Sequence, residues 1–256
     1  MQKQTTKNSL FLTNNSRTHV RTQTGMPDLR EEAFYVIDWK NTYKHDDALH
    51  IKKQEEGYRI KTAIPDVGAP STIYYENLPE KLSMWPYKKP LANDFSMNHG
   101  TLRAAIILSY WTDGKSIDDA VLSRGIIRPQ GRNKKDLPPR IHEQLLQATN
   151  THNIRYAITK TMLMLNRLAG DWFEQNNIPA PYHNHQKNKR YYALDSHGHE
   201  GLNIPRYANI SHPLQSDVHR VTVKQLHDAL TNDKIANEKE IQAFCKHYNK
   251  RIQNAA

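Results

Sequence analysis

The sequence predicts an α+β fold in which a strand-forming first half is followed by a helical second half. Before residue 112, short segments rich in Ile, Val and Tyr carry apolar residues at alternating positions, as strands do. From about residue 138, apolar residues instead recur every three or four positions, as they do on amphipathic helices. Runs of strands followed by runs of helices indicate an α+β rather than an alternating α/β fold.

The expected strands are short and are separated by turn-forming residues. They cover residues 33–38, 47–53, 57–65 and 102–111. Gly57 and Gly114 are each expected to turn a hairpin. Residues 66–101 contain four prolines and are expected to be mostly loop. The basic run at 128–135 is expected to be a flexible connector that either contacts phosphate or is simply solvated.

The second half is expected to contain several helices. Pro138 and Pro139 suit a helix start, and helical periodicity continues from residue 154 to about residue 176. Residues 217–231 and 237–253 are expected to form two further helices. Residues 178–210 are expected to be a polar loop, whose histidines either offer zinc its preferred nitrogen ligands or are ordinary loop residues. These histidines are His183, His185, His197 and His199.

Composition limits the classes of protein to which this chain can belong. A length of 256 residues favours one domain, and 36 Lys and Arg against 26 Asp and Glu give a formal charge of +10. A polyanion such as nucleic acid is therefore a candidate partner, although many basic proteins bind none. The single cysteine, Cys245, cannot form an internal disulfide and is expected to be a small buried hydrophobe in a reducing compartment. No apolar stretch approaches the roughly 18 residues of a membrane span.

Residues 1–27 contain basic and polar residues but no acid, a composition typical of disordered segments. They are expected to form a flexible basic arm ahead of a single compact domain at residues 28–256. The cytoplasm is the expected compartment, and an organelle is the alternative if residues 1–27 are a transit peptide.

Three aspartates near residue 40 are the candidate metal ligands. Asp38 ends a short apolar run, and Asp46 and Asp47 follow a turn-like segment. Hard divalent ions such as magnesium prefer a few carboxylate oxygens with open positions for phosphate and water. A solvated turn is the alternative interpretation, since Asp favours turns and caps.

The same segment resembles the signature of the ribonuclease II family, whose RNB domain carries the pattern I-D-x5-D-x-D-D-A. Ile37, Asp38, Asp46, Asp47 and Ala48 match this pattern. Further segments resemble later motifs of the family, in the same order along the chain: residues 63–67, 82–86, 96–103, 162–169, 199–202 and 207–214. The segment between Arg128 and Ile154 is shorter than is usual in the family, so the domain would be a compact and divergent member.

The resemblance implies a mixed sheet followed by packed helices, and a 3′→5′ hydrolytic exoribonuclease that acts on single-stranded RNA. It implies a magnesium site in which Asp38, Asp46 and Asp47 are metal ligands, with Asp46 also catalytic. Gln215 stands where the family has an arginine that steadies the scissile phosphate. A glutamine can donate a hydrogen bond to phosphate but supplies no charge, and charge-assisted bonds are roughly twice as strong.

Other residues also depart from the family pattern or extend it. Lys44 replaces the second aspartate of the signature, where its ammonium either contacts phosphate or opposes the metal. Tyr75 is the candidate for stacking on bases, and Arg103 and Arg220 are further candidates for RNA contact. The oligonucleotide-binding barrels that flank the family's domain do not fit in 256 residues, so a protein partner is expected to supply part of the RNA-binding surface.

The expected function is therefore single-stranded RNA binding with exoribonuclease chemistry that is weak or lost. The alternative is a catalytically silent RNA-binding or scaffold protein of the same fold, in which the magnesium site is lost as well. The chemistry around Lys44 and Gln215 distinguishes the two.

Overall fold

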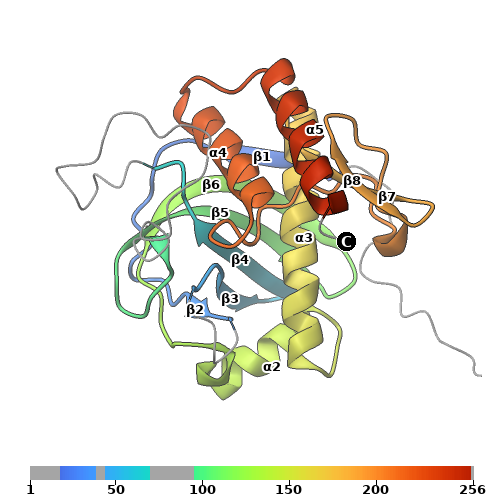
Figure 1. The fold of residues 1–256 in the computed structure, drawn as a ribbon. Coiled ribbons are helices and arrows are strands. Elements are labelled where there is room, and N and C mark those ends of the chain that lie inside the picture. The colour runs from blue at the N-terminus through green and yellow to red at the C-terminus, as the bar shows by residue number, and fades with distance from the viewer. Residues whose placement is uncertain (1–17, 39–43, 70–94, 255–256) are drawn as a thin grey trace, which may run out of the picture.

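The computed structural model describes residues 18–38, 44–69 and 95–254, and it confirms the α+β fold (Figure 1). Six strands form one sheet in the order β1-β6-β5-β4-β3-β2. Their bounds are β1 Val20–Gln23, β2 Tyr35–Val36, β3 Ala48–Gln54, β4 Gly57–Pro65, β5 Arg103–Thr112 and β6 Ile117–Ile127. β1 pairs with β6 in parallel and the other neighbours pair antiparallel, so the sheet is mixed.

The helices follow the sheet and agree closely with the spans that the periodicity predicts. Their bounds are α2 Pro139–Ala148, α3 Ile154–Gln175, α4 Asp217–Thr231 and α5 Glu238–Asn254. Pro139 is the first residue of α2, where its missing N–H has no intrahelical acceptor to lose. The Asn153 side chain caps α3 by accepting hydrogen bonds from the backbone N–H groups of Arg155 and Tyr156.

Figure 1 shows α3 lying across the sheet, and α3 contacts β1 and β4. The core is buried on both faces of β5, because successive side chains of a strand point to opposite sides. Ile106 and Leu108 belong to the main cluster beneath the helices, whereas Ala105 and Ile107 belong to a second cluster on the other face. Phe34, which is fully buried, helps to close that second face.

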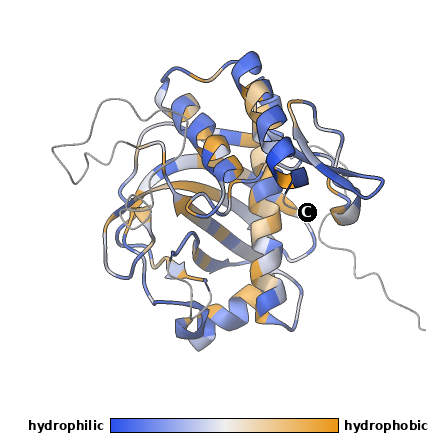
Figure 2. Cartoon of the chain, in the orientation of Figure 1, coloured by the Kyte–Doolittle hydropathy of each residue, from blue (hydrophilic) through white to orange (hydrophobic). Residues whose placement is uncertain are grey.

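Hydropathy follows this layering. Figure 2 shows broad hydrophobic stretches on β5 and α3, whereas α5 is mostly hydrophilic. Cys245, on α5, is buried and free, as predicted. Among the helices within residues 18–38, 44–69 and 95–254, none has the length and apolar content needed to cross a membrane.

The sheet begins earlier in the chain than predicted. Val20–Gln23 forms β1 and pairs with β6, so the flexible arm expected over residues 1–27 does not extend through this strand. Val20 is buried, and the indole Nε1 of Trp172 donates to Thr22 Oγ1 at 2.9 Å. Residues 1–17 lie outside the described part of the chain.

Two segments expected to be loops contain regular structure. Within residues 178–210, β7 Tyr182–Gln186 and β8 Lys189–Ala193 form an antiparallel hairpin, and η3 Glu200–Leu202 is a turn of 3-10 helix. The basic connector at 128–135 also runs into a short 3-10 turn, η2 Lys134–Asp136, which the Asn133 side chain caps. These segments were predicted incorrectly because their strands and turns are polar.

Candidate functional site

The three predicted aspartates lie together because β2 and β3 are paired. Asp38 follows β2 and Asp47 precedes β3, and the two strands run antiparallel with Val36 opposite Ala48. The Asp47 N–H donates to Asp38 Oδ2 at 3.4 Å. All three side chains lie in buried positions, since Asp38, Asp46 and Asp47 are 9%, 0% and 5% exposed. The chain therefore concentrates three carboxylates at the adjoining ends of two strands.

Burial opposes ionisation of these carboxylates. It raises the pKa of Asp46 from its usual value of 3.8 to about 7, against hydrogen bonds from Leu214 and Gln215 that lower it. Burial also raises the pKa of Asp47, and the neighbouring charges of Asp38 and Asp46 raise it further. Within the described residues, Asp47 Oδ1 is buried and has no hydrogen-bond donor. Such a group favours either a proton or a cation.

Gln215 lies at this cluster, as its place in the sequence motifs predicts. The Gln215 side-chain amide donates to Asp46 Oδ2, and the Leu214 N–H donates to Asp46 Oδ1 at 2.8 Å. Lys44 Nζ donates to the carbonyl oxygen of Leu214 at 3.2 Å. Both oxygens of Asp46 are therefore held by the segment that leads into α4, and Lys44 ties the same segment to the aspartate loop.

Asn166, on α3, positions that segment. Its side-chain oxygen accepts from the N–H groups of Ile210 and Ser211, at 2.7 and 3.2 Å. Its amide donates to the hydroxyl groups of Tyr207 and Ser211. A buried asparagine with all of these partners fixes a loop at a defined distance from its helix. The separate sequence motifs around Asn166 and Ser211 are thus parts of one contact.

A glycine on the same helix allows the close approach. A Cβ built at Gly170 would lie 3.0 Å from the backbone carbon of Arg206, which is closer than most side chains tolerate. The Nε of Arg206 in turn donates to Asp171 Oδ1 at 2.6 Å. Segment 206–211 is therefore held against α3 from both sides.

Histidines complete the surroundings of the three aspartates. His45 Nδ1 lies 3.7 Å from Asp38 Oδ2, and His212 Nε2 lies 4.0 Å from Asp47 Oδ2. The His212 N–H donates to His219 Nδ1 at 2.9 Å, which requires a neutral His219. Burial lowers the pKa of His219 to about 3. The position of His45 inside the aspartate motif is a signal that could have identified it.

The other predicted RNA-contacting residues bind protein groups in this structure. Arg103 Nε donates to the Ser96 carbonyl at 2.7 Å, and Arg220 Nε donates to the Pro213 carbonyl at 3.1 Å. Both arginines thereby brace loops that border the aspartates. Tyr75 lies outside the described residues.

The donor set suits a hard divalent ion in chemistry but only partly in arrangement. Three buried carboxylates and an unpartnered Asp47 oxygen are what magnesium prefers. However, both oxygens of Asp46 already accept hydrogen bonds. Among the described residues, the three aspartates do not form a group whose ligand atoms all lie within 4.8 Å of one another. The residues therefore fit an ion held through Asp38 and Asp47 better than one shared equally by all three.

The four histidines of residues 178–210 do not converge as a zinc site. The ring of His199 packs edge to face against the rings of His183 and His185, with centroids 5.0 and 4.9 Å away. His197 instead bonds through Nδ1 to the Tyr191 hydroxyl at 3.1 Å. No three of their ligand atoms meet the 4.8 Å distance within the described residues, so these rings act mainly as hairpin packing.

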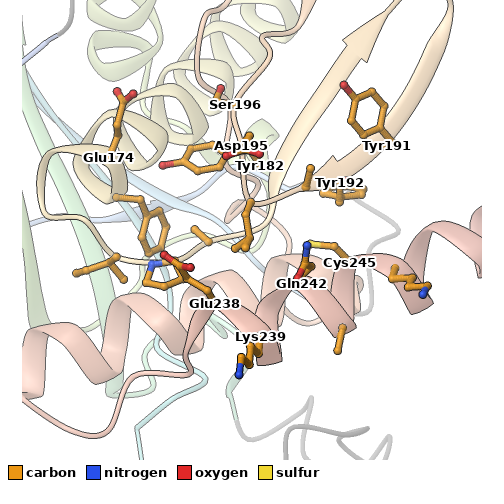
Figure 3. A pocket seen from close by; sticks show the side chains of 18 of the residues that line it. Glu174, Tyr182, Tyr191, Tyr192, Asp195, Ser196, Glu238, Lys239, Gln242 and Cys245 are labelled. Carbon is orange, nitrogen blue, oxygen red and sulfur yellow. The ribbon is translucent and has the colours of Figure 1, made fainter.

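A groove lies elsewhere, between the β7–β8 hairpin and α5 (Figure 3). Tyr182, Tyr191 and Tyr192 line it from the hairpin, and Gln242 and Cys245 line it from the helix. None of the three candidate aspartates borders this groove. The three buried aspartates, rather than this groove, therefore mark the candidate site.

Comparison with known proteins finds similarity in structure alone. No protein-family model matches the sequence, and no curated protein matches it significantly. RNase R of Mycoplasma genitalium, solved with double-stranded RNA, is 12% identical, with a TM-score of 0.74 over 88% of this chain and 63% of that one. An active-site mutant of the Dss1 exoribonuclease of Candida glabrata is also 12% identical, with a TM-score of 0.68 over 85% and 44%.

A further solved structure is described differently. Yeast Ssd1, described as a pseudonuclease, is 12% identical, with a TM-score of 0.62 over 94% of this chain and 45% of that one. The chain thus spans between 44% and 63% of the length of these proteins. At this identity the likeness concerns the fold, which is shared by nucleases and a pseudonuclease alike. The chain has an RNB-like α+β fold.

Proposed function

We propose that this protein binds single-stranded RNA and that its Asp38, Asp46 and Asp47 site has weak or lost 3′→5′ exoribonuclease chemistry. The observation that carries the proposal is the engagement of Asp46 by Leu214 and Gln215. A carboxylate needed for metal binding is here tied to protein donors, and an uncharged amide stands in place of the expected guanidinium.

RNA binding is supported by charge and by fold. The formal charge of +10 favours a polyanionic partner. RNase R, whose fold this chain shares, has been solved with double-stranded and with ribose-methylated single-stranded RNA. This chain spans 63% or less of the similar structures. We also propose that a protein partner supplies additional RNA-binding surface.

Magnesium, if bound, would be held by Asp38 and Asp47, with Asp46 sharing its oxygens with Leu214 and Gln215. When bound there, such an ion would supply a water of lowered pKa and positive charge for the scissile phosphate. The protein groups around it have separate tasks. Gln215 orients Asp46, and Lys44 holds the carbonyl of Leu214 rather than a phosphate. Both residues thus stabilise the arrangement in which Asp46 is bonded to protein donors.

The alternative is a catalytically silent RNA-binding or scaffold protein. It is supported by the same hydrogen bonds at Asp46 and by the likeness to Ssd1, described as a pseudonuclease. In that case the buried carboxylates would be protonated in part, as the raised pKa values of Asp46 and Asp47 favour.

A degradation assay distinguishes these two functions. The full chain is incubated with 5′-labelled single-stranded RNA, with magnesium or with EDTA, and the products are resolved by length. We expect RNA binding in a gel-shift assay and slow, magnesium-dependent shortening from the 3′ end, which Asp47→Asn abolishes without loss of binding. A contaminating nuclease would act equally in the Asp47→Asn preparation. Binding without shortening would establish the silent alternative, and the absence of binding would contradict both functions.

A further inference from the structure

The end of α4 carries a second cluster of metal-ligating side chains, separate from the aspartate site. His227, Asp228 and Asp233 each offer one ligand atom, and these three atoms all lie within 4.8 Å of one another. His227 and Asp228 are buried, whereas Asp233 is exposed. The cluster therefore has a buried base and an edge that solvent reaches.

The imidazole of His227 is held in one orientation. Its Nδ1 bonds to Asp66 Oδ1 at 2.8 Å, and Asp66 is fully buried. The other oxygen of Asp66 accepts from Arg124 Nε at 2.8 Å. Metal-ligating histidines characteristically bond through their second nitrogen to a carboxylate, which fixes the tautomer and strengthens the ligand. Asp66 stands in that relation to His227.

The free ring nitrogen faces the rest of the cluster. His227 Nε2 lies 3.8 Å from Asp233 Oδ2, too far for a hydrogen bond. No described residue makes a hydrogen bond to Nε2, although the side chain is only 4% exposed. A neutral imidazole would direct its Nε2 lone pair at the carboxylate of Asp233, an arrangement that is favourable only when a proton or a metal cation lies between them.

The backbone brings Asp233 back onto the helix. Asn232 adopts a left-handed conformation, with φ of 58°, and the Asp233 N–H donates to the Asp228 carbonyl at 2.8 Å. Thr231 Oγ1 donates to Asp233 Oδ2 at 2.6 Å. The helix end is therefore shaped so that the three ligand atoms converge.

Gly68 is needed for the same arrangement. A Cβ at this position would lie 2.4 Å from the Cβ of His227, a distance that no side chain tolerates. Gly68 thus lets the backbone after Asp66 pack directly on α4, which places Asp66 within hydrogen-bonding distance of His227.

We propose that His227, Asp228 and Asp233 form a binding site for a zinc-class divalent ion. One imidazole nitrogen and two carboxylates, with a further position left to water, is a donor set that suits zinc. The nitrogen ligand favours zinc over magnesium, which prefers oxygen. The site is structural or regulatory in character and does not depend on RNA binding or on the aspartates near residue 40.

Lys224 is the competitor for this ion. Its ammonium forms a hydrogen-bonded ion pair with Asp228 Oδ1 one turn earlier on α4. A bound cation must share or displace this lysine, because two cations on one carboxylate repel each other. Removing the lysine charge should therefore strengthen metal binding.

Zinc titration of the metal-stripped full chain against a chromophoric chelator tests the site. Loss of a residue that only orients a metal ligand typically costs roughly 10–100-fold in affinity, so the double variant Asp228→Asn, Asp233→Asn should bind zinc at least tenfold more weakly. Glu55→Gln, which removes one exposed acid from the β3–β4 turn, should bind as the parent does. Lys224→Gln should bind more tightly.

Two further measurements keep the result unambiguous. Circular dichroism checks that the variants fold, and Asp233→Asn alone, at an exposed position, provides the test if the double variant does not. Cobalt substitution should give visible d–d absorption that magnesium does not compete away. A parent that binds no zinc at micromolar concentration, or equal affinity in the parent and the folded variants, would overturn the proposal.

Discussion

Asp46 is the aspartate of the candidate site that neighbouring protein groups restrain most directly. Its carboxylate is fully buried and accepts two hydrogen bonds, and burial raises its pKa to about 7. The native state therefore takes up a proton as the pH falls through about 7, whereas the unfolded chain does so only near 3.8. Stability contributed by the protonated form is gained between pH 7 and pH 4, and the ionised carboxylate destabilises the fold above pH 7.

Asp46→Asn should therefore stabilise the protein at pH 8 and have little effect near pH 4. Asparagine can still accept from the Leu214 N–H, and the Gln215 amide can rotate to present its oxygen. Each pKa unit corresponds to about 1.4 kcal/mol, so the expected gain at pH 8 is on the order of a few kcal/mol. Urea unfolding at the two pH values measures it. Equal effects at both pH values would show that Asp46 ionises normally.

Gln215 donates to Asp46, and Lys44 donates to the carbonyl of Leu214, so both residues help to hold the candidate site in this arrangement. Lys44→Asp should restore a ligand carboxylate, and Gln215→Arg should return a fixed positive charge beside the scissile phosphate. One well-placed contact of this kind is worth roughly 10²–10³ in rate. If both groups act on one phosphate, the double variant should gain more than either single variant. Lys44→Asp also places a further carboxylate beside the three aspartates, and these like charges repel one another. Hydrolysis is therefore measured at a high magnesium concentration.

Either of two outcomes would revise that interpretation. A double variant no faster than the parent would mean that these positions do not form the reaction site. A fast parent that Lys44→Asp slows would mean that the lysine belongs to a working variant mechanism. Asp47→Asn in the double-variant background is the matched control, because it removes the carboxylate whose oxygen lacks a donor among the described residues.

Sequence patterns identified the candidate residues that lie close together along the chain. Asp38, Asp46 and Asp47 belong to one motif, and antiparallel pairing of β2 with β3 necessarily brings them together. Contacts between distant segments were not predictable in the same way. Asn166 and Ser211 form one hydrogen-bonded unit across 45 positions, and nothing local in either segment specifies the other.

At the scale of elements, helices were easier to predict than edge strands. α4 has the predicted bounds because its apolar residues recur with helical spacing. β1 buries only its first residue, Val20, and the hairpin of β7 buries Tyr182 and Asn184 in alternation with histidines. Strands that bury so few apolar side chains carry little of the alternation that marks a strand.

β1 nevertheless contributes to stability through Val20. This side chain is 2% exposed, and its N–H donates to Gln175 Oε1 at 3.0 Å. Val20→Ala should lower the free energy of unfolding by about 1.5 kcal/mol or more, the cost of the lost apolar burial and the cavity left behind. Gln23→Ala, at the exposed end of the same strand, should change it by less than about 0.5 kcal/mol. Equal effects in urea unfolding would mean that β1 is not anchored in the sheet.

The whole molecule keeps an RNB-like architecture at 12% identity to the proteins it resembles. Buried positions on both faces of β5 and along α3 require only apolar residues of suitable size. Chemical function requires particular residues at particular atoms. The fold can therefore persist while Lys44 and Gln215 replace the expected groups, which is why the fold was predictable and the activity was not.

The basic connector lies beside the aspartate site, because the Lys134 N–H donates to the Asp38 carbonyl at 3.0 Å. Its exposed side chains Arg128, Arg132 and Lys135 would then meet the phosphates of an RNA strand that enters the site. On this connector, exposed positive charge therefore lies beside the candidate site.

Affinity for single-stranded RNA should therefore fall with salt, and the connector should account for part of the fall. About five phosphate contacts would lower affinity roughly 10²-fold between 50 and 200 mM salt through counterion release. Replacing Arg128, Arg132 and Lys135 by Gln should weaken binding and flatten this dependence, as measured by fluorescence anisotropy without magnesium. The matched control replaces Lys52, Lys53 and Lys115, three exposed lysines of β3 and the β5–β6 turn, and so removes the same charge. If both variants lost affinity equally, the net charge of the chain rather than the connector would be attracting RNA, and an affinity independent of salt would contradict RNA binding through phosphates altogether.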